Sequence, residues 1–481
     1  MKCHQWIIAT AILRLCQGTT ESRADDETAE TIKALKKQIE ELDQRVRILD
    51  RKSELDKEAS AELARSAPTM SIDGRGFTLQ SADTNFVLKL RGLLQLDSRT
   101  YVNDGGIKNN DSFVLRRARP IIEGTVFRDF DFLFVPDFGT SASSSTATVP
   151  SIMDVYLNYR YRPELQLRVG KFKTPVGLEQ LQSDSQGYFI ERGHPTQLTP
   201  NRDLGVQLHG EVAGGVFNYA VGVFNGVGDN RSSSNSDFDD EKAVAGRLFF
   251  HPFQRTDLAS LKGLGLGAGA SYGNSEGASG LPNNNGFFSD GVEQWFTYTT
   301  GAGTNANVTA DGAHWRITPQ GYWYYGPLGL LGEYVISAQK LRRASGPTAT
   351  PTVDFLTARN TAWQIEAGWV LTGEDASYKG VSPKKNFDPH HGGWGAFELV
   401  GRYGVLDVDN DVFKGSRPFA SAATSATKAR AWGVGLNWYL NKNVRLALNY
   451  FQTDFAGGDK GSNPVTQRNE KTFLTRVQLA F

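Results

Sequence analysis

The sequence contains very little cysteine and no long apolar segment. Its two cysteines, Cys3 and Cys16, lie in the extreme N-terminal segment, so nothing downstream can form a disulfide. Such a chain can pass through an oxidising compartment without mispaired thiols. No apolar run reaches the roughly 18 residues that a membrane-spanning helix needs, and the mean hydropathy is −0.39. The composition therefore excludes a helical membrane protein, and a closed sheet is the structure with which this chain could cross a bilayer.

The chain also lacks an excess of charge of either sign. Lys and Arg together number 52, as do Asp and Glu, so the formal net charge at pH 7 is zero. Proteins that bind nucleic acid through their overall electrostatic field carry a clear positive excess. We therefore expect no nucleic-acid partner.

The first 24 residues have the features of a secretory signal peptide. Lys2 precedes an apolar stretch at residues 6–15, and Ser22-Arg23-Ala24 resembles the A-x-A type of cleavage site. Arg14 interrupts the apolar stretch. The residues before Cys16 are not the small ones of a lipidation site, so a lipid anchor on Cys16 is the minor alternative to removal of this segment.

Residues 25–67 predict a helix unlike the rest of the chain. Between residues 28 and 64 there is no glycine and no aromatic residue, and apolar residues recur at alternating intervals of three and four. That spacing forms one seam of a coiled coil. The seam consists of Ile32, Leu35, Ile39, Leu42, Val46 and Leu49. We expect a self-associating coiled coil in the periplasm; a solvated amphipathic helix is the alternative.

After a linker at residues 68–76, the chain at residues 77–481 predicts a β-barrel. Apolar and polar side chains alternate in residues 471–481, with the terminal Phe481 on the apolar side, and again in residues 85–99. Lipid offers the backbone no hydrogen-bond partner, so a sheet in a bilayer must close, and its last strand must pair with its first. Alternation alone also fits a soluble sandwich whose polar face points outward.

The connections between the alternating runs are short and long in turn. Eight long connections imply sixteen strands, with short turns in the periplasm and long loops outside. Tryptophan and tyrosine cluster at strand ends, as in Trp323-Tyr324-Tyr325, which suits the headgroup boundary of a membrane. Residues 372–394 do not fit, because a connection expected to be short is much longer than a turn. The expected fold class is all-β: a sixteen-stranded antiparallel transmembrane β-barrel preceded by a short N-terminal coiled-coil helix.

The polar face of the predicted strands carries more basic than acidic residues. If the apolar face points to lipid, the opposite face lines a water-filled pore, where acidic residues such as Glu123, Glu211, Glu366 and Glu398 neutralise part of the positive charge. Fixed cations in a narrow channel attract anions more than they would on an open surface. The candidate pore-lining and anion-binding residues are Lys89, Arg91, Arg116, Arg117, Arg119, Arg168, Lys171, Lys173, Arg247, Arg316 and Arg402.

The densest group of these cations is Arg116-Arg117-Ala118-Arg119. Strand alternation directs Arg117 and Arg119 into the pore and places Arg116 near the lipid interface. Simple solvated charges at a strand end are the alternative.

Lys171 and Lys173 stand where the long connection at residues 174–203 begins. If that loop folds inward, it constricts the pore and brings both lysines, and Arg192 with them, toward the arginines of the first strands. A loop that stays outside the barrel is the alternative.

Patterns typical of catalysis or cofactor binding are weak. The glycines near residues 264–273 alternate with leucine and alanine as in a strand, which argues against a nucleotide-binding loop. His390 and His391 are adjacent and lack the spacing of a metal site. His209 and His314 are more typical of polar pore-lining groups than of a base paired with a nucleophile. We expect no enzyme, with no catalytic residue, no metal and no cofactor.

Several segments together resemble the phosphate-selective porin O and P family. They are Phe113-Val-Leu-Arg-Arg-Ala-Arg119, Asp154-Val-Tyr-Leu157, residues 160–177, Leu371-Thr-Gly-Glu374, and Gly395-Ala-Phe-Glu-Leu399 with Arg402-Tyr403. They occur in the family's order, and the resemblance covers nearly all of residues 77–481. It implies a homotrimer of sixteen-stranded barrels with an inward-folded third loop. It also implies phosphate binding by pore arginines and constriction-loop lysines, for which Arg116, Arg117, Lys171 and Lys173 match motif positions.

The expected function is that of a passive channel for anions, phosphate or polyphosphate in particular, in the outer membrane of a Gram-negative bacterium. The alternatives are a general porin for other small solutes and a structural protein that tethers the envelope or mediates surface contacts. The expected partners are inorganic anions, outer-membrane lipid, further copies of the chain in a homotrimer, and the barrel-assembly machinery, which would recognise the strand that ends in Phe481.

Overall fold

A computed structural model describes the helix and most of the barrel segment. The described residues are 25–74, 76–102, 110–140, 150–235, 237, 240–277, 281, 286–300, 307–346, 350–457 and 469–481. The expected signal peptide, residues 1–24, lies outside them. The chain divides into two compact units between Ala67 and Pro68.

The first unit contains the helix α1, Asp25–Ser66. Its interior has no glycine or proline, and Pro68 comes two residues after its end, where the ring prevents continuation. The predicted N-terminal helix is confirmed. The seam side chains are exposed, from Val46 at 51% to Leu49 at 64%. Among the described residues, no helix combines the length and the apolar character needed to span a membrane.

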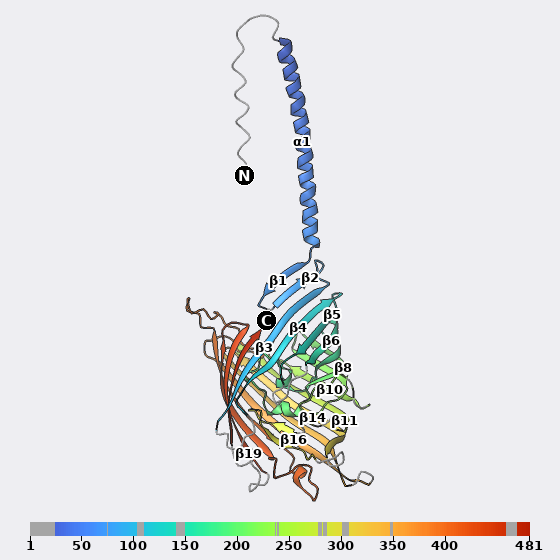
Figure 1. Cartoon of the computed structure of the whole chain (residues 1–481), viewed down its shortest axis with the longest axis vertical. Coiled ribbons are helices and arrows are strands. Elements are labelled where there is room, and N and C mark those ends of the chain that lie inside the picture. Colours follow the sequence, from blue (N-terminus) through green and yellow to red (C-terminus); the bar gives the residue numbers. More distant parts are fainter. Residues whose placement is uncertain are drawn as a thin grey trace. The chain divides into compact units, whose positions relative to one another are not determined.

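In the described part of the second unit, sixteen strands, β3 to β11 and β14 to β20, form a closed antiparallel ring. Figure 1 shows the barrel that they make. The predicted sixteen-stranded barrel is therefore confirmed. The ring strands are β3 Val87–Tyr101, β4 Ser112–Val126, β5 Phe130–Asp137, β6 Ser151–Arg162, β7 Leu165–Lys173, β8 Arg202–Val212, β9 Phe217–Phe224, β10 Ala243–Phe250, β11 Gly263–Gly277, β14 Val308–Tyr325, β15 Leu328–Ser345, β16 Thr352–Val370, β17 Ala396–Asp407, β18 Lys428–Tyr439, β19 Val444–Ala456 and β20 Asn469–Ala480.

The ring closes between β20 and β3. The two strands pair antiparallel from Thr472 opposite Tyr101 to Ala480 opposite Leu93. One residue further on, the backbones of Phe481 and Gly92 exchange hydrogen bonds of 3.0 and 2.9 Å. The terminal strand and its partner thus lie where the alternation placed them, and neither presents a free edge over this length.

A short hairpin covers the part of β3 that extends beyond β20. Strands β1, Thr69–Asp73, and β2, Gly76–Gln80, pair with each other, and β2 pairs with the start of β3, from Phe77 opposite Leu90 to Gln80 opposite Val87. Without β2, the first backbone groups of β3 would lack partners on that side. Most of the segment expected to be a linker is therefore strand.

The connection at residues 371–395, which the sequence left unexplained, folds back into the barrel. Its Ala376 and Val381 are buried against Val370, Ala396 and Tyr439 at the ends of the adjoining strands. The segment is long because it forms part of the filling of the barrel instead of a turn.

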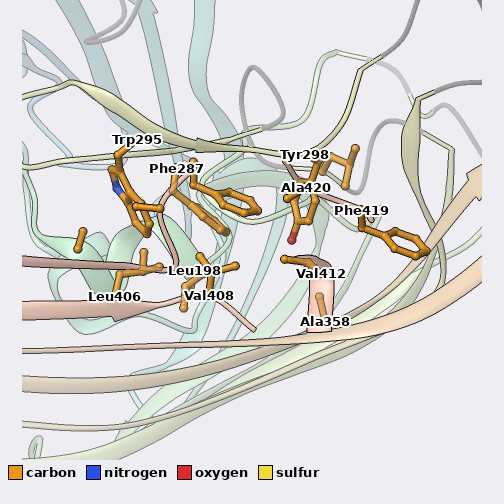
Figure 2. Close-up of a cluster of buried hydrophobic side chains, with 14 of the residues drawn as sticks. Leu198, Phe287, Trp295, Tyr298, Ala358, Leu406, Val408, Val412, Phe419 and Ala420 are labelled. Carbon is orange, nitrogen blue, oxygen red and sulfur yellow. The ribbon is translucent and has the colours of Figure 1, made fainter. Parts of the chain in front are cut away.

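Apolar side chains also occupy one part of the interior. The small strands β12, Gly286–Phe288, and β13, Gln294–Thr297, form a hairpin, here called the inner hairpin, in the connection between β11 and β14. Phe287 and Trp295 of this hairpin are fully buried in one apolar cluster with Leu406 and Ala358 of the wall (Figure 2). On β16, Ala358 and Ala362 alternate with the exposed Phe355 and Ile365, so the buried alanines face inward.

The rule that places every apolar side chain toward lipid is therefore wrong over this sector. The reason is that the inner hairpin needs an apolar surface to pack against. The connection between β17 and β18 also belongs to this core. It contains the helical turn η5, Asn410–Phe413, and its Phe419 and Ala420 are buried in the same cluster.

We expect Trp295→Ala to loosen the inner hairpin without opening the barrel. Removal of a buried tryptophan from a core costs about 3–5 kcal/mol, while the strand ladders stay intact. Limited proteolysis of the purified protein should then cleave between β11 and β14 much faster than in the wild type. Trp432, which is 38% exposed on the outer face, offers the matched control Trp432→Ala. Equal cleavage of the two variants would contradict the packing role of Trp295.

Candidate functional site

The connection between β7 and β8, residues 174–201 and here called the constriction loop, lies inside the barrel. It contains the short helix α2, Leu178–Leu181, and the helical turn η1, His194–Leu198. Wall side chains bind its backbone carbonyls: Gln320 donates to Val176 at 2.8 Å, Asn437 to Tyr188 at 2.9 Å, and Arg445 to Gly187 at 2.8 Å. A buried loop backbone needs such partners, and amide and guanidinium groups on the wall provide them.

Glycines on β11 let the constriction loop approach the wall closely. A Cβ at Gly269 would lie 2.3 Å from the carbonyl oxygen of Val176. The outward residues of the same strand are larger, such as Leu266 and Tyr272, which are 50% and 59% exposed. The alternating glycines near residues 264–273 thus belong to a strand and leave room for the loop.

Two acidic residues of the constriction loop form ion pairs with several arginines, most of which lie on the barrel wall. Glu191 accepts a hydrogen bond from Arg116 at 2.8 Å and lies 3.7 Å from Arg476. Asp184 pairs with Arg192 at 2.6 Å and also accepts a hydrogen bond from Arg119. Two more guanidinium groups lie near the Asp184 carboxylate, that of Arg117 at 3.5 Å and that of Arg202 at 3.7 Å.

The electrostatic surroundings keep Asp184 ionised. Burial by itself raises the pKa of a carboxyl group, because the charged form loses hydration. At Asp184, Arg117, Arg192 and Arg119 outweigh this effect and lower the pKa well below its ordinary value. The same balance, with Arg116 as the main cation, lowers the pKa of Glu191. Both side chains are therefore permanent negative charges among the arginines.

A β-bulge brings Arg116 into this group. In the β3–β4 ladder, Gln95 pairs with Arg117 and the next residue, Leu96, pairs with Leu115, so Arg116 is the extra residue. The bulge reverses the alternation: Leu115 is exposed on the outer face, whereas the next odd-numbered residue, Arg117, is buried. Placement of Arg116 near the lipid interface was therefore wrong, since its side chain contacts Glu191 of the constriction loop.

These residues surround a cavity of about 370 Å³ beside the constriction loop. Five arginines and three carboxylates line it, which leaves an excess of two positive charges. The charged residues of the lining are Arg116, Arg117, Arg119, Arg192, Arg202, Asp137, Asp184 and Glu191. A cavity with this lining favours anions, and guanidinium groups fit the oxygens of phosphate or carboxylate.

The two lysines near the start of the loop have different surroundings. Lys173 donates to the carbonyl of Gln182 in the constriction loop at 2.6 Å. Lys171 is buried, and its ammonium lies 3.4 Å from the side-chain oxygen of Asn235, in the connection between β9 and β10. Neither lysine lines the 370 Å³ cavity.

The remaining candidates are spread along the wall. Arg402 binds Glu366 at 3.2 Å and Asp290 at 2.9 Å, and its side chain is 1% exposed. Arg316 binds Asp229 at 2.6 Å. The others pair as follows: Arg247 with Gln320 at 2.8 Å, Arg91 with Glu123 at 3.1 Å, Arg168 over the ring of Tyr156 at 4.4 Å, and Lys89 opposite Glu123 in the β3–β4 ladder.

The charged residues of the cavity that the sequence analysis missed are Asp137, Asp184, Glu191 and Arg202. Arg202 shares its strand parity with Val206 and Leu208, which are exposed on the outer face. It nevertheless binds Asp154, on β6 of the barrel wall, at 3.0 Å. No sequence pattern marks the two loop acids, since their role depends on where the constriction loop lies. The available signal was that these two acidic residues lie in a loop next to strands rich in basic residues.

The chain is similar to known proteins along most of its length. The model of the family described as phosphate-selective porin O and P matches residues 88–481. Porin O of Pseudomonas aeruginosa is 25% identical over 447 residues, which cover 86% of this chain and 95% of that protein. The solved structure of the outer membrane channel DcaP of Acinetobacter baumannii covers 84% of this chain and 99% of its own, with 11% identity and a TM-score of 0.50. At that identity the likeness concerns the fold.

Proposed function

The chain belongs to the phosphate-selective porin O and P family, and we propose that it lets anions diffuse passively across the outer membrane, with phosphate or polyphosphate as the preferred class. As a member of this family it is an outer-membrane porin and not an enzyme. The observation that carries the anion proposal is the cavity beside the constriction loop, where five arginines face three carboxylates.

The physical basis of the selectivity is the fixed positive charge in a confined space. Low-dielectric walls focus the field of buried guanidinium groups, so an anion gains more there than at an open surface. Arg116, Arg117 and Arg119 come from one strand, and Arg192 and Arg202 from the constriction loop and its end. Arginine donates several hydrogen bonds in a planar fork, which suits an oxyanion better than a single ammonium does.

Under this proposal, the basic residues of the interior have two roles. Arg117 and Arg119 line the cavity and take part in anion binding, and Lys173 holds the constriction loop through the carbonyl of Gln182. Arg316 and Arg402 hold inward-folded segments, because their charges are taken up by Asp229 and by Glu366 with Asp290. A general porin for other small solutes is the alternative, and it would not depend on the arginines of the cavity.

We expect the purified protein in a planar bilayer to prefer anions. With unequal KCl on the two sides, the reversal potential should have the sign of a chloride-selective channel, because the cavity carries an excess of two positive charges. Phosphate added to the chloride solution should reduce the current, since phosphate binds more tightly than chloride and passes more slowly. A reversal potential of the opposite sign would contradict the proposed anion channel.

Arg117→Ala should weaken the block of chloride current by phosphate. The variant removes a guanidinium from the wall of the cavity, and a hydrogen bond to a charged group is worth a factor of about ten or more in affinity. The half-blocking phosphate concentration should rise by at least that factor. Arg402→Ala is the comparison, because Arg402 does not itself line the cavity and its charge is balanced by Glu366 and Asp290, so this variant should change the half-blocking concentration less. Equal shifts in the two variants would place the selective step elsewhere.

A second role is favoured by the exposed seam of α1. We propose that the helix self-associates with those of other copies, in the homotrimer that the family resemblance implies, and so gives the envelope a structural contact besides the pore. The supporting observation is a row of six apolar side chains, all about half exposed or more in the single chain. In water such a row is stabilised by a partner helix.

Deletion of residues 28–64 should leave the conductance of each channel unchanged. The helix and the barrel are separate compact units, so removal of the first leaves the wall and its loops intact. Single-channel recordings of the deletion variant and the full chain provide the measurement. A loss of conductance in a barrel that still resists unfolding by detergent would show that the helix takes part in permeation.

A further inference from the structure

Three basic side chains lie next to one another on the outer face of the barrel wall. They are Lys340 and Arg342 of β15 and Arg359 of β16, here called the outer basic patch. Lys340 and Arg359 are exposed, whereas both sequence neighbours of each are buried, so the two side chains point away from the interior. In the β15–β16 ladder Lys340 pairs with Thr357, two residues from Arg359, so the two cations are diagonal neighbours on one face. Arg342 pairs with the exposed Phe355 in the same ladder. The three side chains therefore form one surface.

The protein neutralises only part of the charge of this patch. Arg342 lies 3.7 Å from Asp311 of β14. Within the described part of the chain, neither Lys340 nor Arg359 takes part in an ion pair. Arg316 on the inner face of β14 differs, because it has a carboxylate at 2.6 Å. Two of the three positive charges of the patch are thus available to a partner outside the protein.

Aromatic rings lie beside both of these cations. The ammonium of Lys340 is 4.9 Å from the ring centroid of Phe355, and the guanidinium of Arg359 is 5.9 Å from that of Trp315. A cation over a ring face keeps donors free for an anion on its other side. The patch thus combines positive charge with flat apolar surface, which suits a ligand that has both phosphate groups and a sugar or hydrocarbon part.

The patch begins where the apolar band of the outer face ends. The outward positions of β15 from Leu328 to Ala338 carry no charged side chain, and Lys340 is the next outward residue. This length of a strand tilted by about 40° covers roughly 25 Å along the membrane normal, which is the height of the hydrocarbon band. A basic side chain on the lipid face is costly at mid-membrane and tolerated at the boundary. Lys340 and Arg342 therefore lie at the depth of the lipid headgroups.

The same order of aromatic and basic residues recurs on neighbouring strands. On β18 the exposed Arg430 stands two residues beyond Trp432, and on β20 Lys471 stands two residues beyond Phe473. Tyr450 of β19 links the two rings, with centroid distances of 5.4 Å to Trp432 and 4.9 Å to Phe473. Such a belt of amphipathic rings marks the headgroup boundary. The basic residues of the outer face thus come directly beyond that boundary.

The patch lies at the end of the barrel that carries the long connections. A short turn at residues 325–328 joins β14 to β15, and Lys340 and Arg342 lie near the other end of β15, which ends at Ser345. Short turns of outer-membrane barrels face the periplasm, so the patch faces the outer leaflet. The lipid of that leaflet is a glycolipid whose sugars carry phosphate groups and several acyl chains.

We propose that the outer basic patch binds the phosphate groups of this phosphorylated glycolipid. Arg342 and Arg359 donate hydrogen bonds to phosphate oxygens, and Lys340 adds a compact positive charge. Trp315 and Phe355 lie against the sugar and the first carbons of the acyl chains. The inference does not rest on the anion preference of the pore, because the patch and the cavity lie on opposite faces of the wall.

The first measurement is the binding of lipid A with two phosphate groups to the purified full-length protein in detergent, followed by native mass spectrometry. The patch variant is the triple substitution Lys340→Gln, Arg342→Gln and Arg359→Gln. Its apparent Kd should be at least about tenfold higher than that of the wild type, because the phosphate groups lose the positive charges near them. Glutamine keeps a long polar side chain at each position.

Three basic residues at the opposite end of the barrel provide the matched control. Arg162, Arg255 and Lys262 are exposed near the short turns and, among the residues described, belong to no ion pair. The control variant Arg162→Gln, Arg255→Gln and Lys262→Gln removes the same number of charges. It should keep the Kd of the wild type, since these residues do not face the outer leaflet.

The wild type alone tests the same contact through the lipid. Lipid A from which both phosphate groups have been removed should bind at least about tenfold more weakly than the phosphorylated form. Inorganic phosphate at the same phosphate concentration should leave the bound lipid unchanged, because the free ion has no acyl chains to lie along the apolar wall. These measurements stand if the patch variant fails to fold.

Each outcome decides the inference. Weaker binding in the patch variant but not in the control, with weaker binding of the dephosphorylated lipid, supports it. Equal affinity of the wild type for the two lipids, or equal affinity in the patch and control variants, would mean that the apolar wall alone holds the lipid, and it would overturn the inference. Displacement of the lipid by inorganic phosphate would make the patch a site for the free ion and would overturn it as well.

The test is separate from that of the anion channel. None of the three patch residues lines the 370 Å³ cavity. The reversal potential of the patch variant should therefore equal that of the wild type, whichever ion the pore prefers.

Discussion

The backbone's need for hydrogen-bond partners in lipid shapes the whole second unit of this protein. An amide or carbonyl left unpaired in hydrocarbon costs several kcal/mol, so the sheet closes between β20 and β3 and leaves no edge there. Where β3 runs past the end of β20, strand β2 continues the pairing. Closure then creates an interior, and the interior has to be filled or hydrated. Every functional feature of the pore follows from how that interior is filled.

Two kinds of filling divide the interior. In the sector of β14 to β19, the inner hairpin packs its aromatic side chains against small apolar residues of the wall, and the connection between β17 and β18 binds part of its backbone, with Ala426 donating to the carbonyl of Trp295 at 3.0 Å. Elsewhere the constriction loop brings a polar backbone into the barrel, and amides and guanidinium groups of the wall bind its carbonyls, as Arg445 does at Gly187. The arginines of this barrel thus have two uses. Some hold loops in place, and others line the cavity that remains.

The charge balance of the cavity depends on the constriction loop as much as on the wall. The basic strands alone would give a strongly positive bore, which would bind an anion tightly and release it slowly. Asp184 and Glu191, which lie on the constriction loop, neutralise part of that charge, and the net excess becomes two positive charges. A channel needs such moderation, because conduction requires that an ion enter readily and also leave.

The amino-acid sequence by itself determined the repeating features: the helix with its exposed seam, the alternation of sixteen strands, the closing strand at residues 471–481, and the family that the motifs resemble. These depend on local periodicity, which each segment carries independently of its neighbours. It also indicated that basic residues such as Arg117 and Arg119 face the interior. Only the tertiary structure decided that a bulge turns Arg116 inward, that residues 371–395 fold back into the barrel, that apolar residues of β16 face an inner hairpin, and that Asp184 lies among four arginines. Each of these contacts joins residues far apart in the chain, so no local pattern encodes them; they exist because closure of the sheet forces distant segments to share one confined interior.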